Sequence, residues 1–480
     1  MSRKPHPEVD VPRQRPLRGL AREARQGLTR GVVPRRPPSD VLRERVRSGA
    51  PRLRSTAAVV TSMTALTATS LVTGPALAEP LFSPCALQRT EAHHSEGLDT
   101  WNAAYPRPTR PLDAVLVFLS FPDSRPHTTP AELTADYFPA TSQFFERASY
   151  GKFTLHPHPQ SDWIRMPHAS TSYAIRRDWN AARRAAYLRD AITAADRQVD
   201  FSRYDVVYFV ADPDAPGVDS DATKVVNLDT PVEADGKDIR RVVTVFEKHP
   251  PDRLVLAHET GHAFDLPDLY HRPSDGNGDW DTYVGDWDLM GSQFGLAPDL
   301  FGWHKWKLGW LEPRQVACVR GRGTTRLTLE PLEAGPVPAA AGAMAGAAQA
   351  AAFGAGAGAS GSLAGAFGSG RGTKLAVVRT GLGSALAFEA RGSTGNDGAT
   401  CTQGVLVYRV RSEAESGAGP VEVVDAHPHS ESCWGDSVYP PLADAPVGLG
   451  ESFTVPGENV HVEVEGRTAS GAWTVKITIS

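Results

Sequence analysis

Two histidines four positions apart, with a glutamate directly after the first, lie in the stretch AHETGHAFDLPDLY at residues 257–270. On a helix, His258 and His262 lie one turn apart on the same face, so both imidazoles can reach one zinc ion at about 2.0–2.1 Å. Glu259 is rotated away from the ion but can reach a water bound to it, which explains the H-E-x-x-H spacing of zinc hydrolases. The alternative is a helix whose two histidines are satisfied in a core without metal.

A helix that carries these groups is predicted by its start and by its apolar content. Pro250 and Pro251 precede Asp252, which is a good capping residue. The apolar residues 254–256 follow and are typical of a buried helix.

A zinc site of this kind needs a third protein ligand. No glutamate occurs between Glu259 and Glu312, which argues against a glutamate ligand on a later helix. The nearby alternatives are Asp265, Asp268, His271 and His304. We prefer Asp268, because Pro267 ends the helix just before it and a turn there would swing its carboxylate back toward the ion.

The elements that must position this motif alternate between helix and strand. Apolar β-type runs at 113–121, 204–212 and 240–248 flank helical patterns around Phe144 and Phe145 and at 178–199. Gly151 is expected to end the first of these helices, and a strand is expected to follow it. This alternation predicts an α/β (α+β) catalytic domain at residues 79–313.

Residues 314–480 have a different character. Short alternating strands separated by Gly and Pro predict an antiparallel β-sandwich. Residues 335–371 are almost entirely Ala, Gly and Ser, and such a segment cannot bury enough apolar surface to offset its ordering entropy. We expect a flexible insertion there, inside the sandwich domain.

The first 78 residues predict a signal or leader region. They contain 15 Lys plus Arg and 5 Asp plus Glu, and an apolar run follows that ends in the small-residue sequence Ala76-Leu77-Ala78. Cleavage after Ala78 would release a secreted, extracellular protein without stable membrane insertion. The alternative is an arginine-rich tail on a cytosolic protein.

The remaining chain is acidic. Residues 79–480 hold 35 basic and 50 acidic residues, a net charge of −15. The acidic charge argues against nucleic acid as a partner, because a phosphate backbone favours basic surfaces.

Four cysteines, Cys85, Cys318, Cys401 and Cys433, lie in this mature part. An even, sparse count after a secretory signal predicts two disulfides. Three pairings are possible, of which we prefer Cys85–Cys318 and Cys401–Cys433. The alternative for Cys85 is a thiol that caps the metal. Trp434 is expected to be a packed core residue near a disulfide, with sugar stacking as the other interpretation.

Several separated motifs resemble one family. The sequences HETGHAFDLPDLY, VGDWDLMGS and LFGWHKWKLGWLEP, in this order, are similar to those of the immune-inhibitor-A-type secreted zinc metallopeptidases of the metzincin group. The resemblance covers about residues 110–315. It implies a zinc endopeptidase fold with a mixed sheet, an active-site helix and a methionine turn under the zinc. It also implies His258, His262 and Asp268 as metal ligands, Glu259 as the catalytic base and Met290 as the turn methionine.

Asp265 departs from the family pattern, which has glycine where the chain leaves the helix. Aspartate is one of the few other residues that visit positive φ, so the turn can form with some strain. Its carboxylate could hydrogen-bond the turn or displace Asp268 as a ligand.

The segment DGNGDWDTYVGDWD, between the ligand turn and the methionine turn, alternates acidic and amide residues. Asp275, Asn277, Asp279 and Asp281 are spaced as in oxygen-rich calcium loops, although Trp280 replaces the glycine that an EF-hand requires. Calcium is therefore a second expected cofactor, with a solvated acidic loop as the alternative.

These observations predict a secreted zinc-dependent endopeptidase that acts on protein or peptide substrates. Zinc would lower the pKa of a bound water to about 7, and Glu259 would accept its proton and pass it to the leaving amine. Tyr270 or Tyr283 would donate to the oxyanion. The alternative is a catalytically degenerate, metalloprotease-like protein whose C-terminal β domain binds cell-surface glycan or protein.

Overall fold

A computed structural model describes residues 84–252, 254–273, 278–335 and 372–480. The leader, its cleavage site and all but the first residue of the Ala/Gly-rich insertion lie outside the described residues. The described residues belong to one compact unit within 78–480, so the division at residue 313 stays a prediction. Among the described residues, no helix has both the length and the apolar character needed to cross a membrane.

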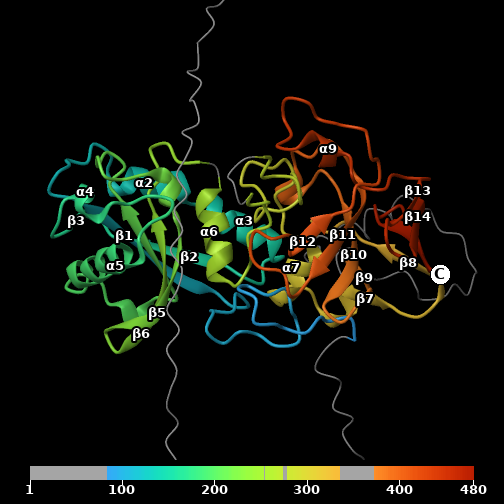
Figure 1. Ribbon diagram of the computed structural model, residues 1–480, viewed down its shortest axis with the longest axis horizontal. Coiled ribbons are helices and arrows are strands. Elements are labelled where there is room, and N and C mark those ends of the chain that lie inside the picture. Colours follow the sequence, from blue (N-terminus) through green and yellow to red (C-terminus); the bar gives the residue numbers. More distant parts are fainter. Residues whose placement is uncertain (1–83, 253, 274–277, 336–371) are drawn as a thin grey trace, which may run out of the picture. The chain divides into compact units, whose positions relative to one another are not determined.

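A mixed sheet forms the first layer (Figure 1). Its strands, in spatial order, are β2 (Leu155–Pro159), β1 (Leu112–Ser120), β4 (Val206–Ala211), β6 (Lys237–Val245) and β5 (Lys224–Ala234), with the short β3 (Ile164–Arg165) also paired to β1. β5 is an edge strand and pairs antiparallel with β6, whereas the other pairs are parallel. The three apolar runs predicted as strands are β1, β4 and β6, within a few residues at each end.

Both faces of this sheet are buried, which explains the continuous apolar sequence of β1. Val115 and Val117 pack on one face with α5 (Ala181–Ala195), and Leu116 and Phe118 pack on the other. The second face is covered by α3 (Ala140–Ala148) and α6 (Val255–Ala263), and Figure 1 shows α5 and α6 on opposite sides of the sheet. Parallel sheets typically need this cover on both sides.

The helix expected before Gly151 is in fact two helices. α2 (Pro130–Tyr137) begins with a capping box between Thr129 and Glu132, and α3 starts after Pro139. Proline has no amide hydrogen and cannot continue a helix, so the sequence FP separates the two. The shorter elements are α4 (Ser170–Tyr173), α7 (Gly302–Lys307), α9 (Pro440–Ala443), and the 3-10 turns η1 (Phe201–Arg203), η2 (Ser220–Ala222), η3 (Pro313–Gln315) and η4 (Gly395–Asp397).

Two further sheets form a sandwich with a shared apolar core. One has the order β12 (Val421–Val423), β11 (Gly404–Arg411), β10 (Ser384–Arg391), β9 (Leu375–Arg379), β7 (Val316–Val319); the other has β13 (Ser452–Thr454), β14 (Val460–Arg467), β15 (Trp473–Ile479), β8 (Gly323–Leu329). The expectation of a purely antiparallel sandwich is wrong at one pair, because β7 runs parallel to β9. The chain leaves β7, passes through β8 in the second sheet and returns to β9, so β7 and β9 are not joined by a hairpin.

Both expected disulfides are present. Cys85–Cys318 and Cys401–Cys433 have Cα–Cα separations of 5.6 Å and 6.3 Å, within the usual range. Cys85 therefore has no free thiol, and the alternative of a metal-capping cysteine is wrong. The first disulfide fixes the segment 85–99, which we call the strap, to β7.

A buried histidine joins the strap to the rest of the unit. His304 Nδ1 lies 2.9 Å from Asp288 Oδ2, and its Nε2 lies 2.9 Å from Glu96 Oε1 in the strap. All three side chains are fully buried. Burial lowers the pKa of His304, but the two carboxylates outweigh it and raise the pKa to about 9. The imidazole is therefore a cation that two anions hold in place.

This arrangement predicts a loss of stability in alkaline solution. The folded protein binds the His304 proton up to about pH 9, whereas the unfolded chain releases it near pH 6.5. The contribution to the free energy of unfolding is complete below pH 6.5 and falls as the pH rises through about 9. Denaturant unfolding at a series of pH values should show this decline, and His304→Gln should remove it while lowering stability at neutral pH. Parallel pH profiles for the two proteins between pH 6.5 and 9 would contradict the assignment.

Candidate metal and catalytic site

The helix that carries the two histidines is α6, and all nine of its residues are buried. Its start differs from the sequence prediction. Leu254 is the N-cap residue with φ 59°, and no side chain caps the helix. The Asp252 carboxylate accepts from Gln293 Nε2 at 3.3 Å, and the Asp252 carbonyl accepts from Val255 N–H at 3.3 Å. A backbone turn therefore replaces the expected aspartate cap, because the Asp252 side chain has another partner.

Backbone carbonyls orient both imidazoles. His258 Nδ1 lies 2.9 Å from the carbonyl of Leu289, and His262 Nδ1 lies 2.8 Å from the carbonyl of Leu266. A carbonyl can only accept, so Nδ1 donates in each ring and Nε2 is the nitrogen directed at Asp268. This is the arrangement found behind histidines that ligate metals. Burial lowers the pKa of His262, but Asp268 and Glu259 outweigh it and raise the pKa to about 9, so a metal ion would displace a proton from this nitrogen.

Asp268 completes a cluster of three groups. Its Oδ1 lies 2.9 Å from His262 Nε2 and 3.4 Å from His258 Nε2. Burial disfavours ionisation of this carboxyl, but the two imidazoles outweigh it and hold the pKa of Asp268 well below its usual range. Asp268 is therefore an anion directed at both ring nitrogens.

The three donor atoms fit a zinc ion. All of them lie within 4.8 Å of one another. Ligands at about 2.0–2.1 Å in a tetrahedral arrangement are about 3.3 Å apart, close to the observed 2.9 Å and 3.4 Å. Among the described residues, no other group of three His, Cys, Asp or Glu side chains has this spacing.

The other candidate ligands lie elsewhere. His271 Nδ1 contacts the Tyr283 hydroxyl at 3.0 Å, and His304 is held between Glu96 and Asp288. Asp265 points away from the cluster toward the strap. Of the four alternatives left open by the sequence, only Asp268 approaches both histidines.

Ser416 orients Asp268 from a distant part of the chain. Its Oγ donates to Asp268 Oδ2 at 3.1 Å and accepts from the Asp268 N–H at 2.8 Å, and the Gly417 N–H donates to the Asp268 carbonyl at 2.9 Å. Ser416 lies in the loop between β11 and β12, 148 residues from Asp268. Nothing in the local sequence around Ser416 pointed to this contact.

Glu259 lies beside the cluster and lines the same cavity. Its Oε2 accepts a hydrogen bond of 2.9 Å from the Val225 N–H in β5. Burial raises the pKa of Glu259, and the neighbouring histidines offset part of that rise. The edge strand therefore holds one oxygen of the only acidic side chain in α6.

Met290 is fully buried and packs against Gly261 of α6. A Cβ added at Gly261 would lie 2.4 Å from Met290 Sδ, so the helix can approach this closely only with glycine there. The Met290 carbonyl accepts from the Leu269 N–H at 2.9 Å. Met290 is thus a core residue that also supports the turn to Asp268.

The cavity has a volume of about 640 Å³. Tyr270 lines it together with the three clustered side chains and Glu259. Tyr283, the alternative hydroxyl donor, hydrogen-bonds with His271 and does not line this cavity. Of the two tyrosines, Tyr270 is therefore the better placed to donate a hydrogen bond to an oxyanion at the cluster.

Asp265 occupies the position where the family pattern has glycine, and its φ is 68°. Its fully buried carboxylate lies 2.6 Å from Arg89 Nη2 and 3.0 Å from His94 Nδ1. The His94 ring in turn stacks on His262 with 5.7 Å between centroids. The aspartate therefore fastens the strap beside the metal cluster, a role that was not predicted for Arg89 or His94.

The expected calcium loop is only partly described. Asp275 and Asn277 lie outside the described residues. Burial, with Asp279 and Asp286 nearby, raises the pKa of Asp281 to about 6. Calcium binding by this loop stays a prediction.

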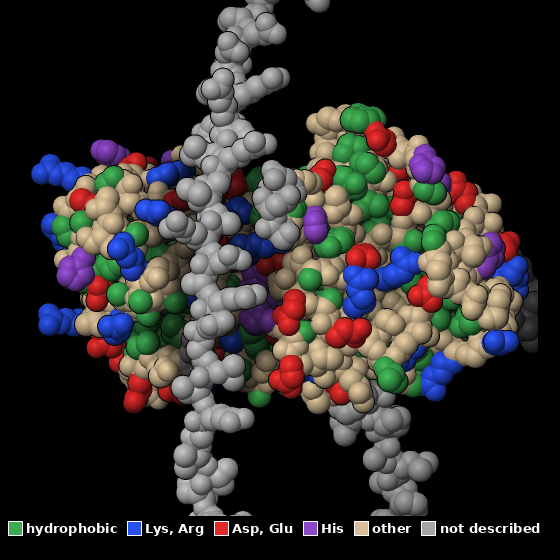
Figure 2. Space-filling view, viewed as in Figure 1, with side chains coloured by type: hydrophobic (Ala, Val, Ile, Leu, Met, Phe, Trp, Pro, Cys, Tyr) green, Lys and Arg blue, Asp and Glu red, His purple; other side chains and the backbone are tan. Residues whose placement is uncertain are grey.

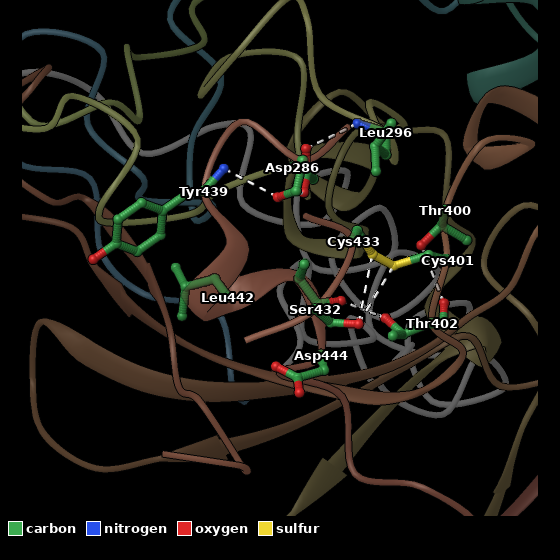
Figure 3. The surroundings of a disulfide bond; sticks show 12 residues. Asp286, Leu296, Thr400, Cys401, Thr402, Ser432, Cys433, Tyr439, Leu442 and Asp444 are labelled. Atoms are coloured by element: carbon green, nitrogen blue, oxygen red, sulfur yellow. Dashed lines mark hydrogen bonds between the residues drawn. A yellow bond between two sulfur atoms is a disulfide. The ribbon is translucent and has the colours of Figure 1, made fainter. Parts of the chain in front are cut away.

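The loop that contains Cys433 is anchored to the segment before Met290. Asp286 accepts from the Val438 N–H at 3.2 Å and from the Leu296 N–H at 3.1 Å, and Figure 3 shows this carboxylate near the Cys401–Cys433 disulfide. Trp287 Nε1 donates to the Leu442 carbonyl at 2.7 Å. Trp434 is 72% exposed, so the expectation of a packed core tryptophan is wrong.

Comparison with known proteins adds no identification: no protein-family model matches the chain, and no curated protein matches it.

The pairing of Asp265 with the strap predicts the effect of a glycine at this position. Asp265→Gly keeps a residue that tolerates positive φ but leaves Arg89 and His94 without their anion. The free energy of unfolding should fall by about 3 kcal/mol, at the low end for a broken buried pair because glycine relieves the backbone. Denaturant unfolding measures this loss, and limited proteolysis should cut the variant within residues 85–99.

Glu91→Ala is the matched control, because Glu91 lies in the same strap and is exposed. It should unfold like the parent and resist proteolysis. An Asp265→Gly variant as stable as the parent would show that the ion pair contributes nothing.

Proposed function

We propose that this protein is a secreted zinc-dependent endopeptidase. The observation that carries the proposal is the convergence of His258, His262 and Asp268, with both Nδ1 atoms held by backbone carbonyls. Two imidazoles and a carboxylate match the three-ligand sets of catalytic zinc sites, which leave a fourth position for water or substrate. The open cavity beside the cluster supports a catalytic site over a closed structural one.

The side chains around this site have separate roles. A bound zinc ion would supply a Lewis acid for the scissile carbonyl and lower the pKa of water to about 7. Glu259 accepts the proton of the attacking water and returns it to the amine nitrogen as the C–N bond breaks, so no external acid or base is consumed. The Val225 N–H holds Oε2 of this carboxylate in place during the transfer. Tyr270 offers a hydroxyl to the developing oxyanion.

The fold agrees with the metzincin resemblance in its general plan. A mixed sheet packs on a helix with the H-E-x-x-H motif, and Met290 packs against Gly261 of that helix. The two disulfides support an extracellular location, where such bonds persist.

The central test is Glu259→Ala. This variant should fold, retain about one zinc per chain and lose casein hydrolysis by at least about 100-fold, because a general base contributes at least that factor. Zinc is measured by elemental analysis of the purified protein, and hydrolysis is measured with and without a chelator, followed by zinc add-back.

Glu146→Ala, at an exposed position of α3, is the control and should keep full activity. Casein hydrolysis by Glu259→Ala at the parent rate would reject the mechanism. A freshly purified parent protein without zinc would reject the site.

A second candidate function is a degenerate metalloprotease-like protein that binds cell-surface glycan or protein through its C-terminal β domain. The exposed Trp434, on a loop fixed by a disulfide, favours it, because exposed aromatic faces stack on apolar faces of other molecules.

If this second function is present, Trp434→Ala should reduce retention on insoluble cell-wall glycan several-fold without changing casein hydrolysis. Leu382→Ala is the control, because Leu382 is 91% exposed in a different hairpin. Equal retention of both variants and the parent would show that Trp434 does not contribute to glycan binding.

A further inference from the structure

Three basic side chains line one flank of the cavity that contains the metal cluster. Arg177 comes from the segment between α4 and α5, Lys224 begins β5, and Arg272 follows the turn at Asp268. We call these three residues the basic flank. They come from separate parts of the sequence, and only the fold brings them to one cavity.

The basic flank is held together by direct contacts. Lys224 Nζ donates to the Arg177 carbonyl at 2.6 Å, and the Arg177 guanidinium lies 5.0 Å from the centre of the Trp280 ring. Burial lowers the pKa of Lys224, and the nearby Arg184 and Arg272 guanidiniums add to that effect. Lys224 is therefore a partly buried cation, for which an incoming anion is favourable. The Arg177 and Arg272 side chains are 48% and 59% exposed, so an incoming ligand can reach both from solvent.

Each of the two guanidiniums of the basic flank has an exposed acidic partner, whereas the buried Glu259 is close enough to Lys224 to raise the pKa of that amine. Asp221 Oδ2 lies 3.8 Å from Arg177 Nε, and Asp178 Oδ1 lies 3.8 Å from Arg272 Nη2. Both carboxylates are more than half exposed, at 66% and 91%, so water screens them. Neither guanidinium donates a hydrogen bond to another residue in the described ranges, which leaves both forks available to an incoming acceptor.

The basic flank begins next to the reacting groups. Lys224 directly precedes Val225, whose N–H holds Glu259. On the other side, the Tyr270 ring stacks on His258 at 6.5 Å and lies 5.3 Å from the Trp280 ring. A peptide positioned for attack at the metal cluster would therefore extend along these three residues.

We infer that the basic flank is a subsite for the carboxylate of a glutamate or aspartate side chain near the cleaved bond of a peptide substrate. The inference rests on the proposed endopeptidase function and names its substrate class. Residues 79–480 carry a net charge of −15, and Figure 2 shows acidic and basic side chains interspersed over the visible face, so the net charge of the protein does not attract acidic peptides. The preference is therefore local to the cavity.

The test uses internally quenched decapeptides in which one glutamate is moved through the positions around the cleaved bond. Each peptide is paired with an isosteric glutamine version. At one position or more, kcat/KM of the parent should be about tenfold higher for glutamate, the effect of a hydrogen bond to a charged group. The double variant Arg177→Gln, Arg272→Gln should cleave both peptides of each pair equally, and Arg177→Glu should prefer glutamine. Salt should reduce the preference of the parent.

Arg183→Gln is the matched control, because Arg183 is exposed on α5 and does not line the cavity. It should keep the tenfold ratio. Equal kcat/KM for glutamate and glutamine at every position in the parent would overturn the subsite, as would an unchanged preference in the double variant.

Peptide binding to Glu259→Ala, measured by fluorescence anisotropy, separates this inference from the proposed function. One outcome is that Glu259→Ala binds the glutamate peptide more tightly, that Arg177→Gln and Arg272→Gln abolish this preference, and that the parent cleaves nothing. This outcome supports the subsite and rejects the peptidase. Zinc-dependent cleavage without any glutamate preference supports the peptidase and rejects the subsite.

Discussion

The candidate site depends on one reversal of the chain, at Asp265. α6 ends at Ala263, and the positive φ of Asp265 turns the backbone so that Asp268 faces His258 and His262. That conformation costs a non-glycine residue on the order of 1 kcal/mol. Here the ion pair with Arg89 and the contact with His94 offset the cost, so the strap and the turn stabilise each other.

This coupling explains why distant segments surround a short motif. The strap reaches the turn through Asp265, and the loop between β11 and β12 reaches it through Ser416. Met290 supports the same turn from below the helix. A metal ligand contributed by a loop needs such support, because ligand precision comes from the groups that hydrogen-bond it.

Buried ionic groups connect these segments to one another and to the sheet that contains β10. Arg391 in β10 is fully buried, forms ion pairs with Glu389 and Asp397, and donates to the carbonyls of Ala297 and Asp299. His304 forms ion pairs with Glu96 in the strap and with Asp288 in the segment before Met290. Removing one partner of such a group leaves an uncompensated charge, so these contacts favour one specific arrangement of the layers.

The local sequence determined the elements whose periodicity and composition are strong. The strands β1, β4 and β6 and the helix with His258, Glu259 and His262 are predicted by the sequence alone. The cysteine count predicts two disulfides, and their pairing is the preferred one of three. Side-chain period and spacing along one helix are local properties, so they can be read without knowing the fold. Asp268 was also preferred among four alternatives, because Pro267 limits how far the helix can extend.

Only the tertiary structure decided the contacts between residues far apart in the sequence. The pairing of Arg89 with Asp265, the support of Asp268 by Ser416, the parallel pairing of β7 with β9 and the basic flank all join distant segments. The exposure of Trp434 likewise depends on which loop covers it. No local period encodes such contacts, because they depend on which surfaces meet after the elements have packed.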